Sequence, residues 1–516
     1  MASALPGSVE VGVIGAGAMG AGIAQIAALA GHRVCLFDTG MGAADRAKAK
    51  IGETLVALAA KGKLDRAAAD TAAGRIVAVH ALGDLVSAKL VVEAIVEDLT
   101  VKRNLFRELE VVVSPDAILA TNTSSLSITA LAAGMKHPGR VAGMHFFNPA
   151  PLMPLVEVVS GLATDAEVAN TIYATALAWG KLPVHARSTP GFIVNRCARP
   201  FYAEALRILG ERAADPATLD AIMRDAGGFR MGPFELMDLI GLDINVAVTR
   251  SVWEAFFHDA RFTPSVMQHE MVAAGYLGRK AGRGFYSYAP DAQRPAPTTE
   301  SPQPTPGKIA RQGDLRMGGD LLARMATAGI SIDAAIADPR FPQGVLRIVG
   351  NEDIVSWLVP GDGRTATSIA AKAGVRDVVA FDLAFDYAHC VRLAVTRADT
   401  CSDAAYLAAV GALQAAGIAV SRVDDVAGLV VLRTVAMLAN EASDAVTQGI
   451  ASAADVDLAM QKGVNYPIGP LAWADALGIG FVRDTLENLA AHYGEDRYRL
   501  SPLITRRVAS GGRLSA

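Results

Sequence analysis

Between residues 9 and 160, apolar positions alternate between short strand-like runs and longer helix-like stretches. The short runs are rich in β-branched or aliphatic residues, and alanine-rich stretches long enough for crossover helices separate the first four of them. The runs are Val9–Ile14, Val34–Asp38, Leu90–Glu93, Ile118–Thr121, Val141–Phe146 and Leu155–Val159. This alternation predicts an α/β domain with a parallel, doubly wound sheet.

The pattern changes at about Gly191, where apolar residues begin to recur near the helical period of 3.6. Phe192–Arg212 and Pro216–Ala226 are the clearest examples, and a helical domain is predicted to about Ser287. Ala289–Lys308 then carries six prolines and cannot form a core, so it is predicted to be an extended linker.

Beyond the linker the chain repeats itself at a constant offset of 237 residues. Gly191–Arg196 aligns with Gly428–Arg433, and the same offset pairs Glu204 with Glu441. The repeat predicts a second helical domain, preceded by a degenerate α/β domain that has no Gly-rich loop for a dinucleotide. The predicted domains are 1–188 (α/β), 189–288 (helical), 289–308 (linker), 309–421 (degenerate α/β) and 422–516 (second helical).

Composition narrows the class of protein further. The 516 residues are 52% hydrophobic and 19% charged, which is typical of a globular protein. The net charge of −4 argues against a nucleic-acid partner, and no apolar run approaches the ~20 residues that span a bilayer. The amino terminus lacks the features of a signal peptide, and the four cysteines show neither metal-ligand spacing nor disulfide density. We therefore expect a cytoplasmic protein without a metal.

A Gly-rich loop follows the first predicted strand. In it Gly15 permits a tight turn, Gly17 lets the backbone approach a pyrophosphate, and Gly20 allows close packing of helix on strand. Asp38 ends the second strand, eighteen residues after Gly20. Its carboxylate can bond both ribose hydroxyls and would repel a 2′-phosphate, which favours NAD over NADP. The first domain is thus predicted to be a Rossmann-like NAD-binding domain, although a Gly-rich turn without a ligand is the alternative.

Polar residues also follow two later strands, where ligands bind in open α/β sheets. Ser124 lies in the cluster after Ile118–Thr121, and His145 ends the strand Val141–Phe146. Glu157 interrupts the returning apolar run, where a carboxylate is costly unless it is paired. A strand, a turn and a returning strand could join His145 to Glu157, and such a pair suits a general base. The alternatives are a helix cap for Ser124 and a satisfied core histidine for His145.

Together these motifs resemble the L-3-hydroxyacyl-CoA dehydrogenases. The resemblance covers residues 9–288 almost continuously, and the intervals between the motifs fit as well as the motifs do. It ends with Gly278–Tyr286, which looks like the closing segment of that family. The resemblance implies an NAD-dependent enzyme that reversibly oxidises (3S)-3-hydroxyacyl-CoA to 3-oxoacyl-CoA.

The resemblance also implies roles for individual residues. His145 and Glu157 would transfer the proton, Ser124 would contact the substrate, and Asn195 would support it. By residue type alone, Asn195 is an ordinary polar residue at a helix end. Contacts to the nicotinamide side and ribose would fall on Glu97, Lys102, Ser124, Asn148 and Lys280, and contacts to coenzyme A on Thr54 and Lys61. Thr54 stands where a serine is familiar in the family.

The duplicated length resembles a bacterial subgroup, the 3-hydroxyadipyl-CoA or 3-hydroxybutyryl-CoA dehydrogenases associated with phenylacetate breakdown. The offset of 237 places Asp382 opposite His145, Ala394 opposite Glu157 and Leu432 opposite Asn195, so we expect the second copy to be structural. Its helical domain could replace the dimer contact of single-copy relatives, and a homo-oligomer is possible. The sequence does not determine the acyl-chain preference.

Two other classes of protein share some of these features. A β-hydroxyacid dehydrogenase typically uses a lysine as its acid and base, but Pro190–Gly210 contains none. A non-catalytic NAD-binding or scaffold protein would have lost the catalytic set, which the first copy retains.

Overall fold

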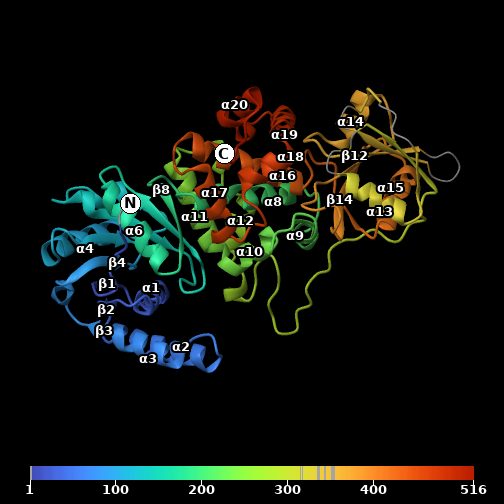
Figure 1. Ribbon diagram of the computed structural model, residues 1–516. Helices are drawn as coiled ribbons and strands as arrows, with labels where there is room; N and C mark the ends of the chain where they lie inside the picture. Colours follow the sequence, from blue (N-terminus) through green and yellow to red (C-terminus); the bar gives the residue numbers. More distant parts are fainter. Residues whose placement is uncertain (1–2, 314, 316–317, 334–337, 342–343, 350–354) are drawn as a thin grey trace. The chain divides into compact units, whose positions relative to one another are not determined.

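Residues 10–187 contain an eight-stranded sheet with the order β3-β2-β1-β4-β5-β6-β7-β8 (Figure 1). Neighbouring strands are parallel, except that β6 and β7 are antiparallel. The strands are β1 (Glu10–Ile14), β2 (Arg33–Phe37), β3 (Ile76–Val79), β4 (Ala88–Glu93), β5 (Ile118–Thr121), β6 (Val141–Phe146), β7 (Leu155–Ser160) and β8 (Leu182–Arg187). All six predicted strands are present to within two residues, which confirms the doubly wound fold.

Two strands of this sheet were not predicted, and both lie at its edges. Pro183 and His185 interrupt the apolar pattern of β8, and an edge strand tolerates proline because one of its sides needs no hydrogen bonds. β3 follows helix α3 without a turn residue between them. Edge strands need a weaker apolar pattern than central ones, so periodicity alone did not identify these two.

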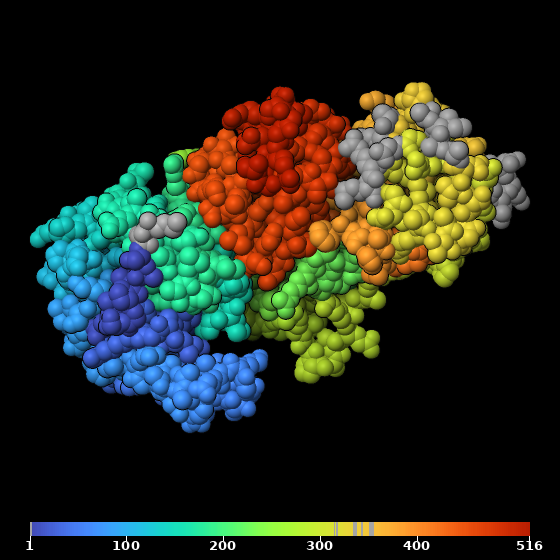
Figure 2. All heavy atoms as spheres, viewed as in Figure 1, coloured from blue at the N-terminus to red at the C-terminus, as the bar shows by residue number. Residues whose placement is uncertain are grey.

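Six helices accompany the first sheet. They are α1 (Ala18–Leu29), α2 (Ala43–Ala60), α3 (Arg66–Arg75), α4 (Leu99–Val112), α5 (Ile128–Ala132) and α6 (Ala166–Ala178). The buried faces of α1 and α6 pack with the apolar side chains of the strands in one core. Helices α2 and α3 contact each other and form a pair that extends beyond the sheet, as the light-blue surface in Figure 2 shows.

The next segment is helical, as predicted, but its first long helix is interrupted. The helices are α7 (Val194–Cys197), α8 (Arg199–Gly210), α9 (Pro216–Asp225), α10 (Pro233–Ile240), α11 (Leu242–Ala255) and α12 (Val266–Ala273). The predicted helix Phe192–Arg212 is divided because Pro200 has no N–H to bond the carbonyl four residues earlier. The equivalent helix of the second copy has Met437 at this position and is continuous, α16 (Val431–Thr447).

The Pro-rich segment contains no helix or strand from residue 289 to residue 307, and it leads into a seven-stranded sheet. The segment is held along this sheet, since the Glu300 amide donates to the Val420 carbonyl at 2.8 Å. The strand order is β10-β9-β11-β12-β13-β14-β15. The strands are β9 (Lys308–Gln312), β10 (Ser331–Asp333), β11 (Val345–Val349), β12 (Val355–Pro360), β13 (Val378–Phe381), β14 (Arg392–Arg397) and β15 (Ala419–Arg422), with helices α13 (Gly319–Thr327), α14 (Ala366–Ala373) and α15 (Asp403–Ala415).

A second helical segment completes the chain, and the structure extends the repeat into the two sheets. After α16 its helices are α17 (Ala453–Gly463), α18 (Pro470–Leu477), α19 (Ile479–Tyr493) and α20 (Pro502–Ser510). β6, β7 and β8 begin at Val141, Leu155 and Leu182, and β13, β14 and β15 each begin 237 residues later. The strand directions agree as well: β12 and β13 are parallel, β13 and β14 antiparallel, and β14 and β15 parallel.

The computed structural model describes residues 3–313, 315, 318–333, 338–341, 344–349 and 355–516. The apolar run Gly344–Gly350 contains β11, and Gly350 lies outside the described residues. By internal contacts the chain divides into two units, Met1–Arg196 with Ala445–Val464, and Cys197–Asp444 with Asn465–Ala516. None of the described helices is long and apolar enough to cross a membrane.

Within these units the two copies contact each other reciprocally. In the first unit the Arg187 amide donates to the Ile450 carbonyl at 2.8 Å. In the second unit the Asp424 amide donates to the Ala213 carbonyl at 2.9 Å. Asp424 is the equivalent of Arg187, 237 positions later, and Ala213 is the equivalent of Ile450, 237 positions earlier. Such exchange of partners is the mark of a two-fold contact between equivalent surfaces. The two copies are therefore related by an approximate two-fold exchange of contacts.

Buried ion pairs also join the two copies inside the second unit. Glu204 of the first copy pairs with Arg497 and Arg433 of the second at 2.9 and 2.8 Å. Glu441, the equivalent of Glu204, pairs with Arg261 of the first copy at 3.0 Å. Burial alone would raise the pKa of Glu204, but the charges of Arg497 and Arg433 outweigh it and lower the pKa to about 2.

Replacing Glu204 with glutamine is expected to lower the free energy of unfolding by about 3–5 kcal/mol, because two buried guanidinium groups lose their shared carboxylate. Since the folded-state pKa is depressed, this stabilisation is complete above the ordinary carboxyl pKa and is lost as pH falls from about 4.5 towards 2. Urea unfolding of both proteins at pH 7 and pH 3.5 measures the effect. Equal losses of stability at the two pH values would contradict it.

Candidate active site

The Gly-rich loop lies between β1 and α1, and its three glycines meet different steric demands. Gly15 has a φ of 99°, and a Cβ there would lie 2.5 Å from the Ala94 carbonyl oxygen. A Cβ on Gly20 would lie 1.8 Å from the Gly15 oxygen, so helix α1 approaches the loop too closely for any side chain. Around Gly17, in contrast, nothing lies within 4 Å of the Cβ position. The loop thus leaves open space above a helix start, where backbone amides can hold a phosphate.

Asp38 lies at the end of β2 and contacts the same loop. Its Oδ2 accepts from the Ala16 amide at 2.7 Å, and its Oδ1 accepts from the Gly40 amide at 2.8 Å. The carboxylate is half-buried and keeps free acceptor positions, because each oxygen has more than one lone pair. The residues present therefore fit a dinucleotide, with the open loop for its pyrophosphate and the carboxylate for a ribose.

A buried network of charges supports the Ser124 loop. Lys102 is 1% exposed, and its Nζ lies 2.5 Å from Glu93 Oε1 and 3.3 Å from Glu97 Oε2. Glu97 Oε1 in turn accepts from the amides of Ser124 and Ser125 at 3.0 and 3.2 Å. Burial opposes ionisation of Glu97, but hydrogen bonds from the serine loop and the charge of Lys102 lower its pKa below the ordinary value.

Sequence reasoning missed Glu93, which is central to this network. It is fully buried at the end of β4 and accepts from Thr121 Oγ1 at 2.7 Å and from the Ile95 amide at 2.7 Å. The available signal was the position of this carboxylate at the end of an apolar strand. A carboxylate buried there has to be paired. Asn122 was missed as well, and its Oδ1 accepts from the Phe146 amide at 2.8 Å.

His145 and Glu157 face each other across the antiparallel pair of strands. They are direct partners in the register of β6 and β7, so both side chains project from the same side of the sheet. His145 Nδ1 lies 2.6 Å from Glu157 Oε2, and both residues are buried. The rings of Phe147 and Phe192 lie 4.6 and 5.9 Å from the imidazole, between ring centroids. These apolar rings exclude water from one side of the pair.

The other oxygen of Glu157 is held by the start of the first helical segment. Glu157 Oε1 accepts from the amides of Ile193 and Val194, each at 3.0 Å. Phe192 has a φ of 48°, a left-handed conformation that is uncommon for a bulky side chain. This turn directs the two amides at the carboxylate, so the position of Glu157 depends on how the turn is packed.

The remaining predicted residues are not all brought to this pair. Asn195 Nδ2 donates to the Ser124 carbonyl at 3.2 Å, which joins two of the predicted positions. Asn148, three residues after His145, is exposed. Thr54 and Lys61 are exposed on α2 and at its C-terminal end. Lys280 belongs to the second unit, where its Nζ lies 2.6 Å from Asp243 Oδ1.

The second copy has an equivalent helix start, but a residue from a different strand accepts from its backbone amides. Asp382, at the position of His145, accepts from the amides of Val430, Val431 and Leu432 at 3.0, 2.7 and 3.1 Å. Burial raises the pKa of Asp382 to about 6, against the effect of these donors. Ala394 stands opposite it on β14, so the carboxylate is on the other strand and there is no imidazole beside it. At these described positions the second copy therefore has no counterpart of the contact between His145 and Glu157.

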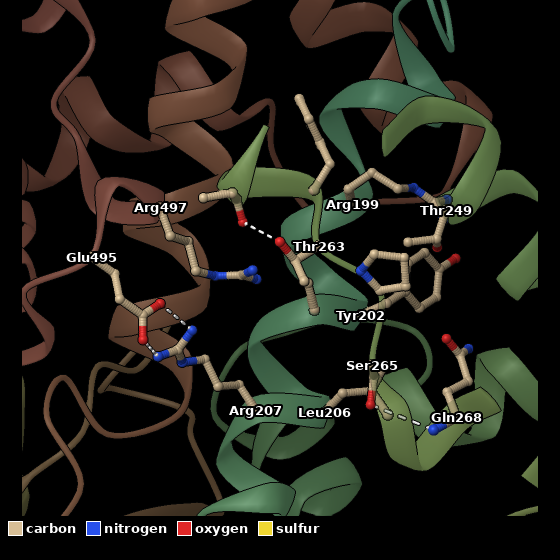
Figure 3. Close-up of a pocket in the computed structure, with 14 residues that line it drawn as sticks. Arg199, Tyr202, Leu206, Arg207, Thr249, Thr263, Ser265, Gln268, Glu495 and Arg497 are labelled. Atoms are coloured by element: carbon tan, nitrogen blue, oxygen red, sulfur yellow. Dashed lines mark hydrogen bonds and ion pairs between the residues drawn. The ribbon is translucent and has the colours of Figure 1, made fainter. Parts of the chain in front are cut away.

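A pocket of about 270 Å³ lies in the second unit, among α8, α11 and α12 (Figure 3). Arg199 Nη1 donates to Thr249 Oγ1 at 3.0 Å, and its guanidinium lies 4.9 Å from the centre of the Tyr202 ring. Arg207 and Glu495 form an ion pair at one side. None of the residues predicted for catalysis, cofactor or coenzyme A is among the residues that line this pocket.

Comparisons with known proteins agree over nearly the whole chain. Residues 10–189 match the NAD binding domain of 3-hydroxyacyl-CoA dehydrogenase, and residues 191–288 and 428–515 each match its C-terminal domain. Residues 358–426 match a 3-hydroxybutyryl-CoA dehydrogenase reduced Rossmann-fold domain. The two matches to one C-terminal domain confirm the predicted duplication.

Two relatives match this chain over nearly its full length, and a third matches its first half. The chain is 44% identical to 3-hydroxyadipyl-CoA dehydrogenase of Escherichia coli K12 over 96% of this chain and 97% of that protein. A crystal structure of 3-hydroxybutyryl-CoA dehydrogenase from E. coli K12 aligns over 98% and 99% of the two chains, with a TM-score of 0.87 and 42% identity. A single-copy enzyme, (S)-3-hydroxybutyryl-CoA dehydrogenase from Ralstonia eutropha, covers 55% of this chain and all of its own, with a TM-score of 0.53 and 40% identity.

Proposed function

Because the chain belongs to the 3-hydroxyacyl-CoA dehydrogenase family, we propose that it oxidises (3S)-3-hydroxyacyl-CoA to 3-oxoacyl-CoA with His145 and Glu157 as its acid and base pair. The reaction is reversible and uses NAD. The observation that carries the assignment of the pair is the 2.6 Å contact between His145 Nδ1 and Glu157 Oε2. The names of the two full-length relatives specify different acyl groups, hydroxyadipyl and hydroxybutyryl. We therefore propose 3-hydroxyadipyl-CoA or 3-hydroxybutyryl-CoA as the substrate.

The chain's own groups move the proton and hold the reacting oxygen. Since Nδ1 of His145 faces Glu157, Nε2 is the nitrogen that takes the proton from the 3-hydroxyl of the substrate. The Glu157 carboxylate stabilises the resulting imidazolium and fixes the orientation of the ring. Ser124 and Asn195 orient the oxygen. When bound, NAD supplies the acceptor for the hydride from C3.

The cofactor and coenzyme A are assigned to the remaining residues. The loop that Gly15, Gly17 and Gly20 shape would hold the pyrophosphate with its backbone amides, and Asp38 would hold the ribose hydroxyls. Glu97, Lys102, Asn148 and Lys280 are proposed around the nicotinamide and its ribose. Because Lys102 is buried between two carboxylates, it would act mainly by fixing Glu97 and the serine loop. Thr54 and Lys61 are proposed for coenzyme A; they are exposed, and a cation suits its phosphates.

The test is to follow NADH absorbance while the purified protein is offered acetoacetyl-CoA, with NADPH in parallel. Oxidation of NADH but hardly of NADPH is expected, because the Asp38 carboxylate repels a 2′-phosphate. Comparing acetoacetyl-CoA with 3-oxoadipyl-CoA then decides between the two acyl classes. No oxidation with either substrate, while NADH still binds, would favour a non-catalytic NAD-binding protein.

We further propose that the second helical segment replaces the subunit contact of single-copy relatives. The support is the exchange of partners between the copies, in which Glu204 accepts from Tyr498 and Glu441 pairs with Arg261, which stands 237 positions before Tyr498. A crystal structure showing the two helical segments apart would contradict this proposal. Sedimentation of the full chain would show whether further copies associate.

A cytoplasmic location is also proposed. The 516 residues include only four cysteines, and all four are buried, which is typical of compartments in which structural disulfides are rare.

A further inference from the structure

One helix of the second copy belongs to the same unit as the catalytic pair. Residues 445–464, which include α17, group with the first sheet, and α17 contacts β7 and β8 (Figure 1). The Arg187 amide at the end of β8 donates to the Ile450 carbonyl just before α17. The second copy is thus packed directly against the strand that carries Glu157.

Gly463, the last residue of α17, lies tightly against this strand and the turn after the sheet. A Cβ added there would lie 2.7 Å from Leu155 Cδ2 and 3.0 Å from Val194 Cγ2. Leu155 begins β7 two residues before Glu157, and Val194 supplies one of the two amides that hold the Glu157 carboxylate. Both side chains are buried, at 0% and 2% exposed, and have little room to move.

The reciprocal contact in the other unit shows what is particular about Gly463. Helix α9 of the first copy contacts β14 of the second sheet, as α17 contacts β7. The residue equivalent to Gly463 is Ala226, directly after α9, and its carbonyl accepts from the Phe385 amide at 2.7 Å. The glycine is found on the side where a helix start holds the catalytic carboxylate.

We propose that α17 is a positioning element of the active site. Through Gly463 it fixes Val194 and the start of β7, and so holds Glu157 against His145 in the geometry that proton transfer needs. This inference rests on the catalytic pair proposed above. It assigns the second copy a role in the reaction rate, through α17, in addition to its contacts with the first copy.

The test compares two valine substitutions in the full-length protein. Gly463→Val should lower kcat by about 10- to 100-fold, since a displacement of about 1 Å in a catalytic constellation has effects of that size. The KM for acetoacetyl-CoA and the Kd for NADH should stay within about twofold of wild type, because neither binding surface is contacted. Gly480→Val is the matched control, since a Cβ there meets nothing within 4 Å, and it should leave kcat unchanged.

A size-compensating double variant tests whether the effect of Gly463→Val passes through Val194. In the Gly463→Val background, Val194→Ala removes the contacted methyl groups but keeps the backbone amide, so part of the lost kcat should return. A kcat within twofold of wild type for Gly463→Val, a parallel loss of NADH binding, or no recovery in the double variant would each overturn the proposal. Failure of the catalytic assignment itself is distinguishable, because His145→Gln would then retain turnover in the same assay.

Discussion

Replacing His145 with glutamine is expected to lower kcat by about 10³-fold or more while the Kd for NADH changes little. The loss follows because glutamine cannot take up a proton, and general acid–base catalysis by a positioned group is worth about 10²–10⁴-fold. Glutamine keeps a similar volume and can still donate to Glu157, so the buried carboxylate keeps a partner. Steady-state oxidation of NADH with acetoacetyl-CoA, together with a fluorescence titration of NADH, measures both quantities.

His185 provides a matched control for this substitution. It lies on β8 of the same sheet, and its ring stacks on Tyr173 with centroids 4.6 Å apart, away from Glu157. His185→Gln should therefore keep kcat within about twofold of wild type. Retained turnover in His145→Gln, with the control also active, would refute the role assigned to His145.

Glu157→Gln is the second change for which a large effect is expected, a loss of about 10³- to 10⁴-fold in kcat. The amide oxygen can still accept from Ile193 and Val194, so its NH₂ group turns towards His145 Nδ1. A donor at that position selects the tautomer with its proton on Nε2, the nitrogen that has to accept the substrate proton. An amide in place of a triad carboxylate costs about 10⁴-fold in kcat for this reason in serine proteases.

The second copy supplies the control for this variant too. Asp382→Asn makes the same carboxylate-to-amide change at a helix start with equivalent backbone donors, but beside no imidazole. It should alter stability without lowering kcat. Equal losses of kcat in Glu157→Gln and Asp382→Asn would mean that the carboxylates act only through folding.

Much of the fold was predictable because the residues that specify it are local. The alternation of apolar runs located six strands, and a constant spacing between like residues revealed the duplication without any structure. The contact of His145 with Glu157 could be expected because a short turn joins their strands and both residues interrupt or end apolar runs. Gly15 and Gly20 of the first loop were recognisable because a Cβ at either position would collide with backbone atoms.

What the sequence did not reveal depends on contacts between distant segments. The pairing of Lys102 with Glu93 and Glu97 unites residues of a strand, a loop and a helix, and nothing in their spacing sets the pairing. The predicted helix Phe192–Arg212 is divided before Pro200, because apolar periodicity does not register the N–H that proline lacks. The grouping of α17 with the first sheet depends on the exchange between copies, which no local pattern encodes.

The carboxylate at each helix start restricts which substitutions the second copy can accept. Both copies satisfy the same buried amides, but Glu157 does so from β7 and Asp382 from β13. A single Asp382→His change would leave those amides without an acceptor, and a single Ala394→Glu change would set two carboxylates side by side. Either change alone is expected to lower the stability of the chain, so the second copy could acquire a contact like that of His145 with Glu157 only through both changes together. The buried amides require one carboxylate in each copy, Glu157 in the first and Asp382 in the second.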